Sequence, residues 1–442
     1  MKKNIIIIVS FIVVLLIFIS GGLEFPKYAG RLPYLLLVFG IEYYVWRSFK
    51  DAESKWGRFM RRFFWIPDLL LLGFFIIARV IPFEHWNGPL RTYFMGLILV
   101  IYLPRLFPFP FILIKDIVHY SGKALHYSLP RFEKGFFNAG INFSLLAFIL
   151  LMYGVLFGVY RFKVYDQQVQ IDKLPASFEG MRIVQISDMH LGSWISDKPL
   201  KEAVIDINNL YPDIIFFTGD LVNFTSDEAF RFREVLKSVK APLGVYAILG
   251  NHDYGDYIHW PDSIKKQRNL DTLCDFYKKI GWRLLRNESV VIHKGTDSLL
   301  LIGVENWSVK KLYGHKGNML KAIGNHKQLP LEILLSHDPT HWQFEITKDF
   351  PEVNLTLSGH THGFQMGFET KKFEFSPAQW MYKYWGGLYE HPQKGGKLQY
   401  LYVNRGLGHI GYPGRIGMNP EITLLTLTGM QNSLNKKTTS GQ

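Results

Sequence analysis

Long apolar runs dominate the first 160 residues of this 442-residue chain. A helix needs about 20 apolar residues to cross the hydrocarbon core of a bilayer. Most of the runs approach or exceed that length, and the second is the shortest. The pattern therefore predicts about five transmembrane helices within residues 1–160. The runs lie at roughly 4–21, 32–47, 64–83, 93–114 and 139–160.

The first run has a second interpretation. Lys2 and Lys3 precede it and the residues ISGG follow it, as in a cleaved signal peptide. Its long apolar core and the lack of an Ala-x-Ala-like site favour a retained membrane helix.

After residue 160 short apolar runs, rich in β-branched and aromatic residues, alternate with helix-like segments. This alternation is typical of the buried strands of an α/β domain. We expect such a domain over 161–430, with a helix at 262–280 inside a longer insertion at 254–286. A polar tail at 431–442 is expected to be disordered. Strands are predicted at 182–187, 213–219, 244–249, 299–304, 331–336 and 353–358, and helices at 198–210 and 226–239.

Basic residues are unevenly divided among the loops between the apolar runs. The loops at 48–63 and 115–137 contain five and four Lys or Arg residues, whereas those at 22–31 and 84–92 contain three together. Cytoplasmic loops are enriched in Lys and Arg. The chain is therefore expected in the cell membrane as a multi-pass protein, with its N-terminus inside and residues 161–442 outside the cytoplasm. Cleavage after the first run would give the same orientation.

The net charge and the cysteine content limit the partners and the cysteine sites that the chain can have. The net charge of +13 divides into +9 for residues 1–160 and +4 for the remainder, so membrane topology explains most of it. A nucleic-acid partner gains little support. The residual charge suits an anionic substrate or a lipid surface. With Cys274 as the only cysteine, an intrachain disulfide and a thiolate metal cluster are both impossible.

Polar side chains cluster where the predicted strands stop. Strands of one sheet end side by side, so residues distant in sequence can converge there. In extended backbone, residues i and i+2 point the same way, which lets each Asp-x-His or His-x-His pair face one pocket. The residues at these strand ends are Asp188, His190, Asp220, Asn251, His252, Asp253, His337, His360 and His362.

Oxygen and nitrogen donors without Cys suit borderline divalent ions. Mn, Fe or Zn would fit this set better than Ca or Mg. A carboxylate shared by two ions would hold them about 3.5–4 Å apart, as in two-metal hydrolases. A lone His at a strand end is usually a polar cap, but a series of such strand-end motifs argues against that interpretation.

The ordered blocks DMH, GD, GNHD, SH and GHTH resemble the motif set of calcineurin-like metallophosphoesterases, over residues 188–362. The segment at 404–427 is similar to the C-terminal block of the membrane-anchored bacterial branch. The resemblance implies an N-terminal transmembrane α-helical region followed by an α/β metallophosphoesterase domain. That domain would be a four-layer, two-sheet β-sandwich flanked by helices, with its site at the strand ends.

The resemblance also implies roles for individual residues. His252 would contact the phosphoryl group or protonate the leaving oxygen, and Asp253 would orient His252. Asn223 stands where many relatives have Asp, which affects no expected ligand. One ion would be held by Asp188, His190 and His362, the second by Asn251, His337 and His360, with Asp220 bridging the two.

The implied activity is metal-dependent hydrolysis of a phosphoric ester. A water bridging two cations would lose its proton, and the hydroxide would attack phosphorus in line. The metals and His252 would stabilise charge on the phosphoryl oxygens. Such a reaction needs no side-chain nucleophile, in agreement with the absence of a Gly-x-Ser-x-Gly motif.

Aromatic residues follow both the His-x-His block and Asp253, and are interpreted either as packing or as an apolar substrate groove or membrane-interface belt. A membrane tether is compatible with a lipid phosphate or lipid pyrophosphate as substrate, and another anionic phosphodiester or pyrophosphate stays open. Arg405 and Arg415 would then bind an anionic head group, with structural ion pairs as the alternative.

Two other functions remain open. The first is a UDP-2,3-diacylglucosamine pyrophosphatase of lipid A synthesis. The predicted outside location counts against it, because nucleotide-activated sugars are made inside. The second is a non-catalytic, ligand-binding membrane sensor, which would be expected to lack some of the seven metal ligands.

The tripeptide Gly-Asn-His occurs twice, ending at His252 and at His326. The first copy ends a buried strand and precedes a carboxylate. The second follows a helix-like run and precedes Lys327, which would repel a cation. Asn325 and His326 are therefore predicted to form a helix-ending turn.

Overall fold

The computed structural model describes residues 32–51, 55–80, 86–310, 313–370, 373–393 and 395–429. The apolar run at 4–21 and the predicted tail at 431–442 lie outside these residues.

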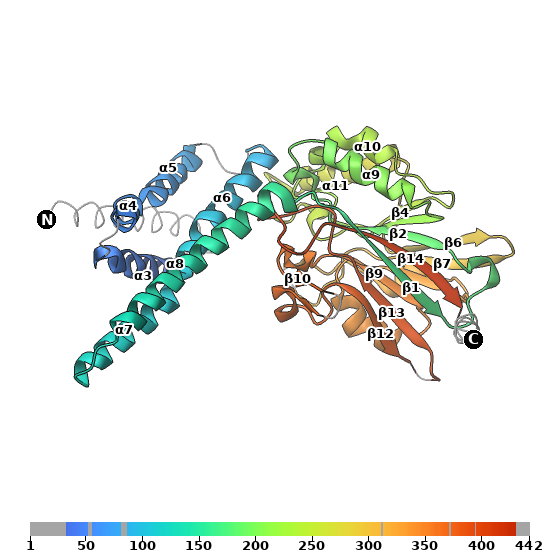
Figure 1. Cartoon of the computed structure of the whole chain (residues 1–442). Coiled ribbons are helices and arrows are strands. Elements are labelled where there is room, and N and C mark those ends of the chain that lie inside the picture. The colour runs from blue at the N-terminus through green and yellow to red at the C-terminus, as the bar shows by residue number, and fades with distance from the viewer. Residues whose placement is uncertain are drawn as a thin grey trace. The chain divides into compact units, whose positions relative to one another are not determined.

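The chain divides into two compact units. The first comprises residues 1–86 and 94–152, and the second comprises 87–93 and 153–442. Helices are the regular elements of the described residues in the first unit, joined by turns and short connections (Figure 1). Its helices are α3 (Leu32–Ser48), α4 (Lys55–Phe63), α5 (Ile66–Val80), α6 (Gly88–Leu106, from residue 94), α7 (Pro108–Ala124) and α8 (Pro130–Tyr153).

Two helical stretches of the described residues are long and apolar enough to cross a membrane. They are Gly88–Ala124 and Pro130–Gly158. Both extend into the loop predicted at 115–137, so that prediction was wrong in extent. Proline is favoured in the first turn of a helix, and Pro130 starts α8 within that segment.

A charged cluster joins three helices of the first unit. Arg105 on α6 lies 2.9 Å from the carboxylate of Asp68 on α5 and 3.3 Å from that of Glu42 on α3. Charged groups among apolar helices are costly unless they are paired, so this cluster fixes the three helices to one another.

The second unit is built on two six-stranded sheets (Figure 1). In the first, β2, β3 and β4 are parallel, and β14 pairs with β2 antiparallel and with β1 in parallel. In the second, β7, β8 and β9 are parallel. The first sheet runs in the order β1 (Lys163–Ile171), β14 (Glu421–Gly429), β2 (Arg182–Ile186), β3 (Ile214–Phe217), β4 (Val245–Ala247) and β5 (Arg283–Leu284). The second sheet runs in the order β12 (Gly387–Pro392), β13 (Leu398–Val403), β9 (Leu355–Ser358), β8 (Glu332–Leu335), β7 (Asp297–Gly303) and β6 (Glu288–Lys294).

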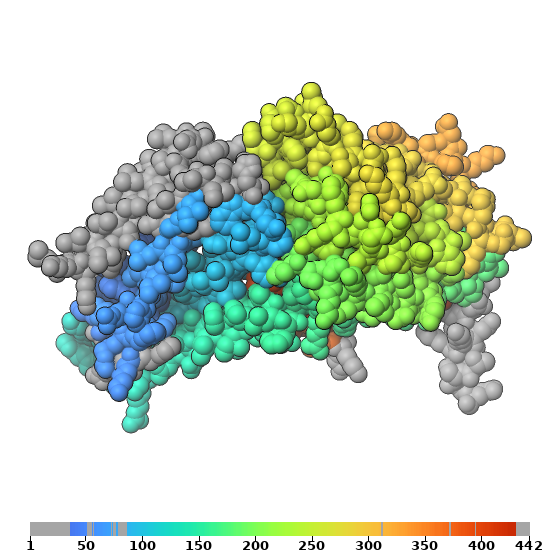
Figure 2. Space-filling view, turned by 90° about the horizontal axis from the view of Figure 1, so that it is seen from above, coloured from blue at the N-terminus to red at the C-terminus, as the bar shows by residue number. Residues whose placement is uncertain are grey.

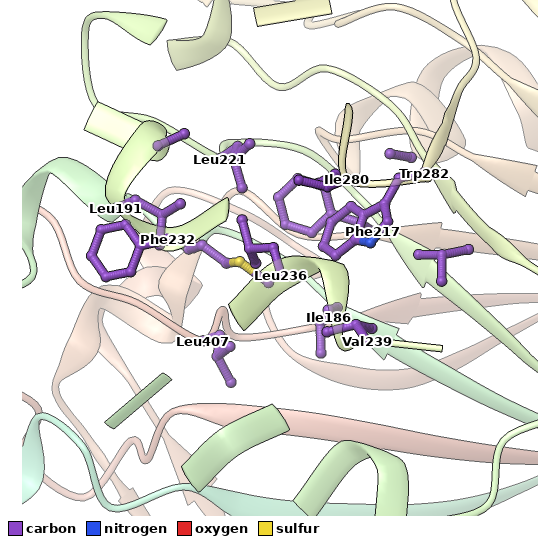
Figure 3. Packing of buried hydrophobic residues seen from close by; sticks show 14 of the residues in the cluster. Ile186, Leu191, Phe217, Leu221, Phe232, Leu236, Val239, Ile280, Trp282 and Leu407 are labelled. Atoms are coloured by element: carbon purple, nitrogen blue, oxygen red, sulfur yellow. The ribbon is translucent and has the colours of Figure 1, made fainter. Parts of the chain in front are cut away.

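Alternating strand residues divide the interior into layers. On β2, Ile183 belongs to the core between the two sheets, whereas Val184 and Ile186 belong to the core beneath the helices. This is the period of two expected of a strand buried on both faces. Figure 3 shows the helix-side core, where Phe217 and Trp282 pack with ring centroids 5.5 Å apart.

Helices cover the outer face of each sheet. On the first sheet lie α9 (Lys198–Asn209), α10 (Arg233–Lys237) and α11 (Ser263–Lys279), in the green-to-yellow segment that forms much of the face in Figure 2. Buried residues of α9 recur at 200, 203, 204 and 207, the spacing of one helical face. On the second sheet, α12 (Met319–Ile323) and the segment Trp342–Ile346 pack against β7, β8 and β13. The result is the four-layer sandwich that the sequence predicted.

All six predicted strands and the predicted helices at 198–210 and 262–280 are confirmed. The helix predicted at 226–239 is a 3₁₀ segment, Ser226–Phe232, followed by α10. The sequence analysis missed β1, β5, β6, β12, β13 and β14, which include the edge strands of both sheets.

Candidate metal centre

The candidate ligands all follow central strands of the two sheets. Asp188 and His190 follow β2, and Asp220 follows β3 in the same sheet. His337 follows β8, and His360 follows β9 in the second sheet. The β-sandwich thereby brings the ends of both sheets to a single site.

One group of donors consists of Asp188, His190 and His362, all buried. Their donor atoms lie within 4.8 Å of one another. Nε2 of His362 is 3.0 Å from Nε2 of His190 and 3.4 Å from the carboxylate of Asp188. Two ring nitrogens and a carboxylate oxygen converging at such distances form a typical donor set for a divalent cation.

A second group consists of Asp220, His337 and His360. Nε2 of His337 is 3.2 Å from the Asp220 carboxylate and 3.3 Å from Nδ1 of His360. Oδ1 of Asn251 is 3.1 Å from Nε2 of His337. The side-chain amide of Asn251 donates to the Tyr257 hydroxyl at 2.7 Å, which directs its carbonyl oxygen toward this group.

Asp220 lies between the two groups. Its Oδ2 is 3.2 Å from Nε2 of His337 and 3.6 Å from Nε2 of His190. One carboxylate oxygen thus faces both groups, as expected of a ligand shared by two ions.

The electrostatics of the site fit a cation. Burial lowers the pKa of His190 and of His362 well below the ordinary value, so both rings are neutral and can offer a lone pair. Burial also opposes charge on His337, but the carboxylates of Asp220 and Asp188 raise its pKa to about 10. A bound cation would replace the proton on His337, because imidazole ligates metals in its neutral form.

Hydrogen bonding orients His337 for this role. Its Nδ1 lies 2.7 Å from the carbonyl oxygen of Thr218, which can only accept a hydrogen bond. Nδ1 therefore keeps its hydrogen when a cation displaces the other proton, and the cation would meet the lone pair of Nε2. The residues present thus fit two divalent cations.

The backbone is strained at the candidate ligands. Five of them adopt left-handed conformations, a region that costs a non-glycine residue on the order of 1–3 kcal/mol. Such strain persists only where the surrounding structure enforces it, and it is concentrated at functional sites. The φ angles are 50° for Asp188, 47° for His190, 61° for Asp220, 72° for His360 and 53° for His362.

His252 borders the pocket beside these donors. Its Nδ1 is 2.9 Å from the carbonyl oxygen of Asn223, and its backbone N–H donates to Asp220 at 2.8 Å. The ring packs against Tyr257, with centroids 4.4 Å apart. Because a carbonyl only accepts, Nδ1 carries a hydrogen, and the Asn223 contact leaves Nε2 free of this partner.

The expected role of Asp253 is corrected. Its carboxylate accepts the backbone N–H groups of Gly250, Asp220 and Leu221, each at 2.9 Å. The Asn223 carbonyl therefore orients the His252 ring instead. Asp253 joins the loops after β3 and β4, and so acts on the site through the backbone.

Arg405 and Arg415 are each only 1% exposed. Arg405 pairs with Glu374 at 2.9 Å and with Glu421 at 3.4 Å. Arg415 donates to the backbone carbonyls of Arg405, Gly406 and Gly408 at 2.6 to 3.0 Å. These internal partners correct the head-group expectation in favour of the structural alternative.

The pocket over the donors has a volume of about 170 Å³. Its lining combines polar residues of the donor groups with the apolar side chains of Phe364, Met381 and Ile410. Phe364 and Met381 are about half exposed, at 48% and 47%.

The sequence analysis missed several partners of the ligands. The Tyr382 hydroxyl is 3.0 Å from Nε2 of His360. The Asp338 carboxylate lies 3.5 Å from the same nitrogen and accepts from Ser308 at 2.6 Å. Asp338 directly follows His337, so a search for acidic neighbours of the ligands could have found it.

The strand-end donors on this sandwich define a metal-dependent phosphoesterase. The family model for calcineurin-like phosphoesterase matches residues 181–364. A second model, described as a probable calcineurin-like phosphoesterase, transmembrane domain, matches residues 30–159. The chain belongs to the calcineurin-like phosphoesterase family, as a membrane protein of that family.

Three relatives illustrate the family's range. The chain is 30% identical to YkuE, an uncharacterized metallophosphoesterase of Bacillus subtilis, over 68% of this chain and 97% of the relative. It is 29% identical to a transmembrane protein with metallophosphoesterase domain of Danio rerio, over 78% of this chain and 74% of the relative. It is also 29% identical to the UDP-2,3-diacylglucosamine pyrophosphatase LpxG of Chlamydia trachomatis, over 57% of this chain and 84% of the relative.

Proposed function

We propose that the chain is a membrane-anchored, dinuclear metal-dependent phosphoesterase that hydrolyses a phosphodiester or pyrophosphate bond. The observation that carries this proposal is Oδ2 of Asp220, which lies within 3.6 Å of a nitrogen from each donor group. Two divalent ions, with Mn, Fe or Zn favoured by the donor set, would polarise the phosphoryl group and activate water.

The protein's own residues would divide the remaining tasks. Asp188, His190 and His362 hold one ion, and Asn251, His337 and His360 hold the other. In its protonated form, His252 would donate from Nε2 to a phosphoryl oxygen or to the leaving oxygen, while the Asn223 carbonyl accepts from Nδ1 and fixes the ring.

We propose a lipid-linked phosphate as the substrate, hydrolysed outside the cytoplasm. The partly exposed apolar side chains of Phe364 and Met381 in the pocket lining support an amphipathic substrate. A chain embedded in a bilayer would meet such molecules at high local concentration. The alternative is a UDP-2,3-diacylglucosamine pyrophosphatase, which the similarity to LpxG favours and the predicted outside location opposes.

Asp220→Ala tests the catalytic proposal. Purified protein with Mn²⁺ is assayed on bis-p-nitrophenyl phosphate, and the variant is expected to lose hydrolysis and bound metal together. His326→Ala, in the exposed second Gly-Asn-His copy, is the matched control. Hydrolysis that survives Asp220→Ala would refute the mechanism and leave the ligand-binding sensor as the better description.

Location and substrate are tested separately. A C-terminal reporter that fluoresces only in the cytoplasm should stay dark if the proposed orientation is correct. Incubation with extracted phospholipids and nucleotides should consume a lipid phosphate, whereas consumption of UDP-2,3-diacylglucosamine alone would favour the alternative.

A further inference from the structure

Residues Asn87–Tyr93 group with the phosphoesterase unit, although most of them begin the apolar helix α6. Within them, Arg91 is only 8% exposed. The pocket lining does not include Arg91, and neither donor group contains it. A buried arginine outside the pocket and both donor groups needs a partner for its charge, and the partners of Arg91 indicate its role.

Arg91 contacts the loop that follows β3. Its Nη2 lies 3.4 Å from Oε1 of Glu228, and its guanidinium lies 4.0 Å from the centroid of the Phe224 ring. The Glu228 side chain is 7% exposed. A carboxylate buried to this degree is costly unless it is paired, so Arg91 supports its charged form.

Glu228 in turn holds the backbone of the same loop. Its Oε2 accepts the N–H groups of Asn223 at 2.6 Å and of Phe224 at 3.2 Å. Charge-assisted hydrogen bonds of this kind are stronger than neutral ones. The position of Asn223 therefore depends on the carboxylate that Arg91 supports.

The residue after Arg91 reaches Asn223 from another side. Thr92 Oγ1 lies 3.2 Å from the hydroxyl of Ser193, which also accepts the side-chain amide of Asn223 at 2.8 Å. Asn223 is thus held at its backbone through Arg91 and Glu228, and at its side chain through Thr92 and Ser193.

Asn223 holds the candidate catalytic histidine, through the 2.9 Å contact between its carbonyl oxygen and Nδ1 of His252. Three consecutive contacts thereby link Arg91 to His252, through Glu228 and Asn223. A displacement of about 1 Å in a catalytic group can lower a rate on the order of 100-fold.

We propose that Arg91 is a positioning residue for His252, so that the start of α6 sets the catalytic geometry of the phosphoesterase domain. The proposal rests on the proposed function of His252. Arg91 touches neither the substrate nor the metals. It keeps Glu228 in place, and Glu228 keeps the Asn223 carbonyl where the His252 ring needs it.

Kinetics of the full-length protein with saturating Mn²⁺ test this proposal. Two aryl phosphodiesters are compared, one releasing p-nitrophenol and one releasing the more basic phenol. Proton donation matters more for the basic leaving group. Arg91→Gln is expected to lower kcat for the phenol ester on the order of 10- to 100-fold, and less for the nitrophenol ester, with KM and metal content unchanged.

Matched variants separate positioning from general damage. Arg91→Lys should restore the greater part of kcat, and Arg131→Gln, at an exposed arginine of the helical unit, should leave it unchanged. Glu228→Gln should reproduce the leaving-group dependence. In a His252→Ala background, Arg91→Gln should lower kcat little further, because both substitutions remove the same contribution, that of the positioned His252 ring.

Hydrogen exchange gives a readout that does not depend on activity. The backbone N–H groups of Asn223 and Phe224 should exchange faster in Arg91→Gln than in Arg131→Gln, since both donate to Glu228. Unchanged exchange together with wild-type kcat would overturn the proposal. If His252→Ala itself had no effect on kcat, the failure would lie with the proposed function instead.

Discussion

The two copies of Gly-Asn-His have the same three residues but differ in burial and in the element that each follows. The first follows β4, where Asn251 is 2% exposed and faces His337, and His252 borders the pocket. The second follows α12, where Asn325 and His326 are exposed. Its glycine, Gly324, has φ of 58° and ends the helix, as the sequence analysis predicted. A metal-binding tripeptide is therefore defined by the strand ends around it.

The largest difference between the copies should appear in turnover. His252→Ala is expected to lower kcat on the order of 10²- to 10⁴-fold, the usual contribution of a general acid or base. His326→Ala should leave kcat unchanged. Steady-state kinetics with bis-p-nitrophenyl phosphate measure both. Equal losses in the two variants would mean that the copies are not functionally distinct.

Metal affinity should separate the two asparagines next. Asn251→Ala removes a carbonyl oxygen that faces the second donor group. Loss of an amide ligand should weaken apparent Mn²⁺ binding at least as much as loss of an outer-shell partner, on the order of 10- to 100-fold. Asn325→Ala should give the wild-type titration. The comparison breaks if Asn251→Ala binds Mn²⁺ normally.

His409 is a buried histidine outside the site, and it tests whether burial alone makes a histidine catalytic. It is fully buried between the rings of Tyr93 and Tyr160, outside both donor groups. Burial lowers its pKa from 6.5 to about 3. Between pH 3 and pH 6.5, His409 therefore binds a proton in the unfolded chain but not in the folded one. The contribution of the neutral His409 to the free energy of unfolding is full above pH 6.5 and falls as the pH decreases toward 3.

His409→Phe should remove this dependence. Between pH 7 and pH 5 the metal-free wild type should lose about 2 kcal/mol more than the variant. Denaturant unfolding at several pH values measures the difference, and kcat at pH 7.5 should change little. Identical pH slopes for the two proteins would contradict the assignment.

The smallest effect should come from the glycine of the second copy. Gly324→Ala places a Cβ at φ 58° and ψ −134°, a backbone region that only glycine adopts readily, and is expected to cost on the order of 1 kcal/mol of stability. Turnover should be unaffected, because the turn is remote from the donors. A thermal unfolding scan combined with kcat tests this pairing, and a change in kcat would show that the turn communicates with the site.

Patterns local in sequence predicted the centre of the fold and the composition of the site. Strands buried on both faces, such as β3, are continuous apolar runs and are recognisable in isolation. Partly exposed edge strands, such as β1 with its alternating exposure, carry a weaker signal and were missed. The motif blocks identified the donor residues because their spacing is local.

Features that depend on distant contacts could not be predicted. Arg415 resembles a substrate-binding arginine in sequence, but the carbonyls that satisfy it come from residues 405–408 and other segments. The partner of His252 was misassigned for the same reason. Asp253 is adjacent in sequence, yet the Asn223 carbonyl is adjacent in space.

The place of β14 in the first sheet has a consequence for biogenesis. This strand lies between β1 and β2, pairing with Lys163–Ile171 on one side and with Arg182–Gln185 on the other. It is the last strand to be synthesised among the described elements, so the sheet cannot close while the ribosome is still translating residues 421–429. Until β14 has been synthesised, a nascent chain would expose unpaired edges of β1 and β2.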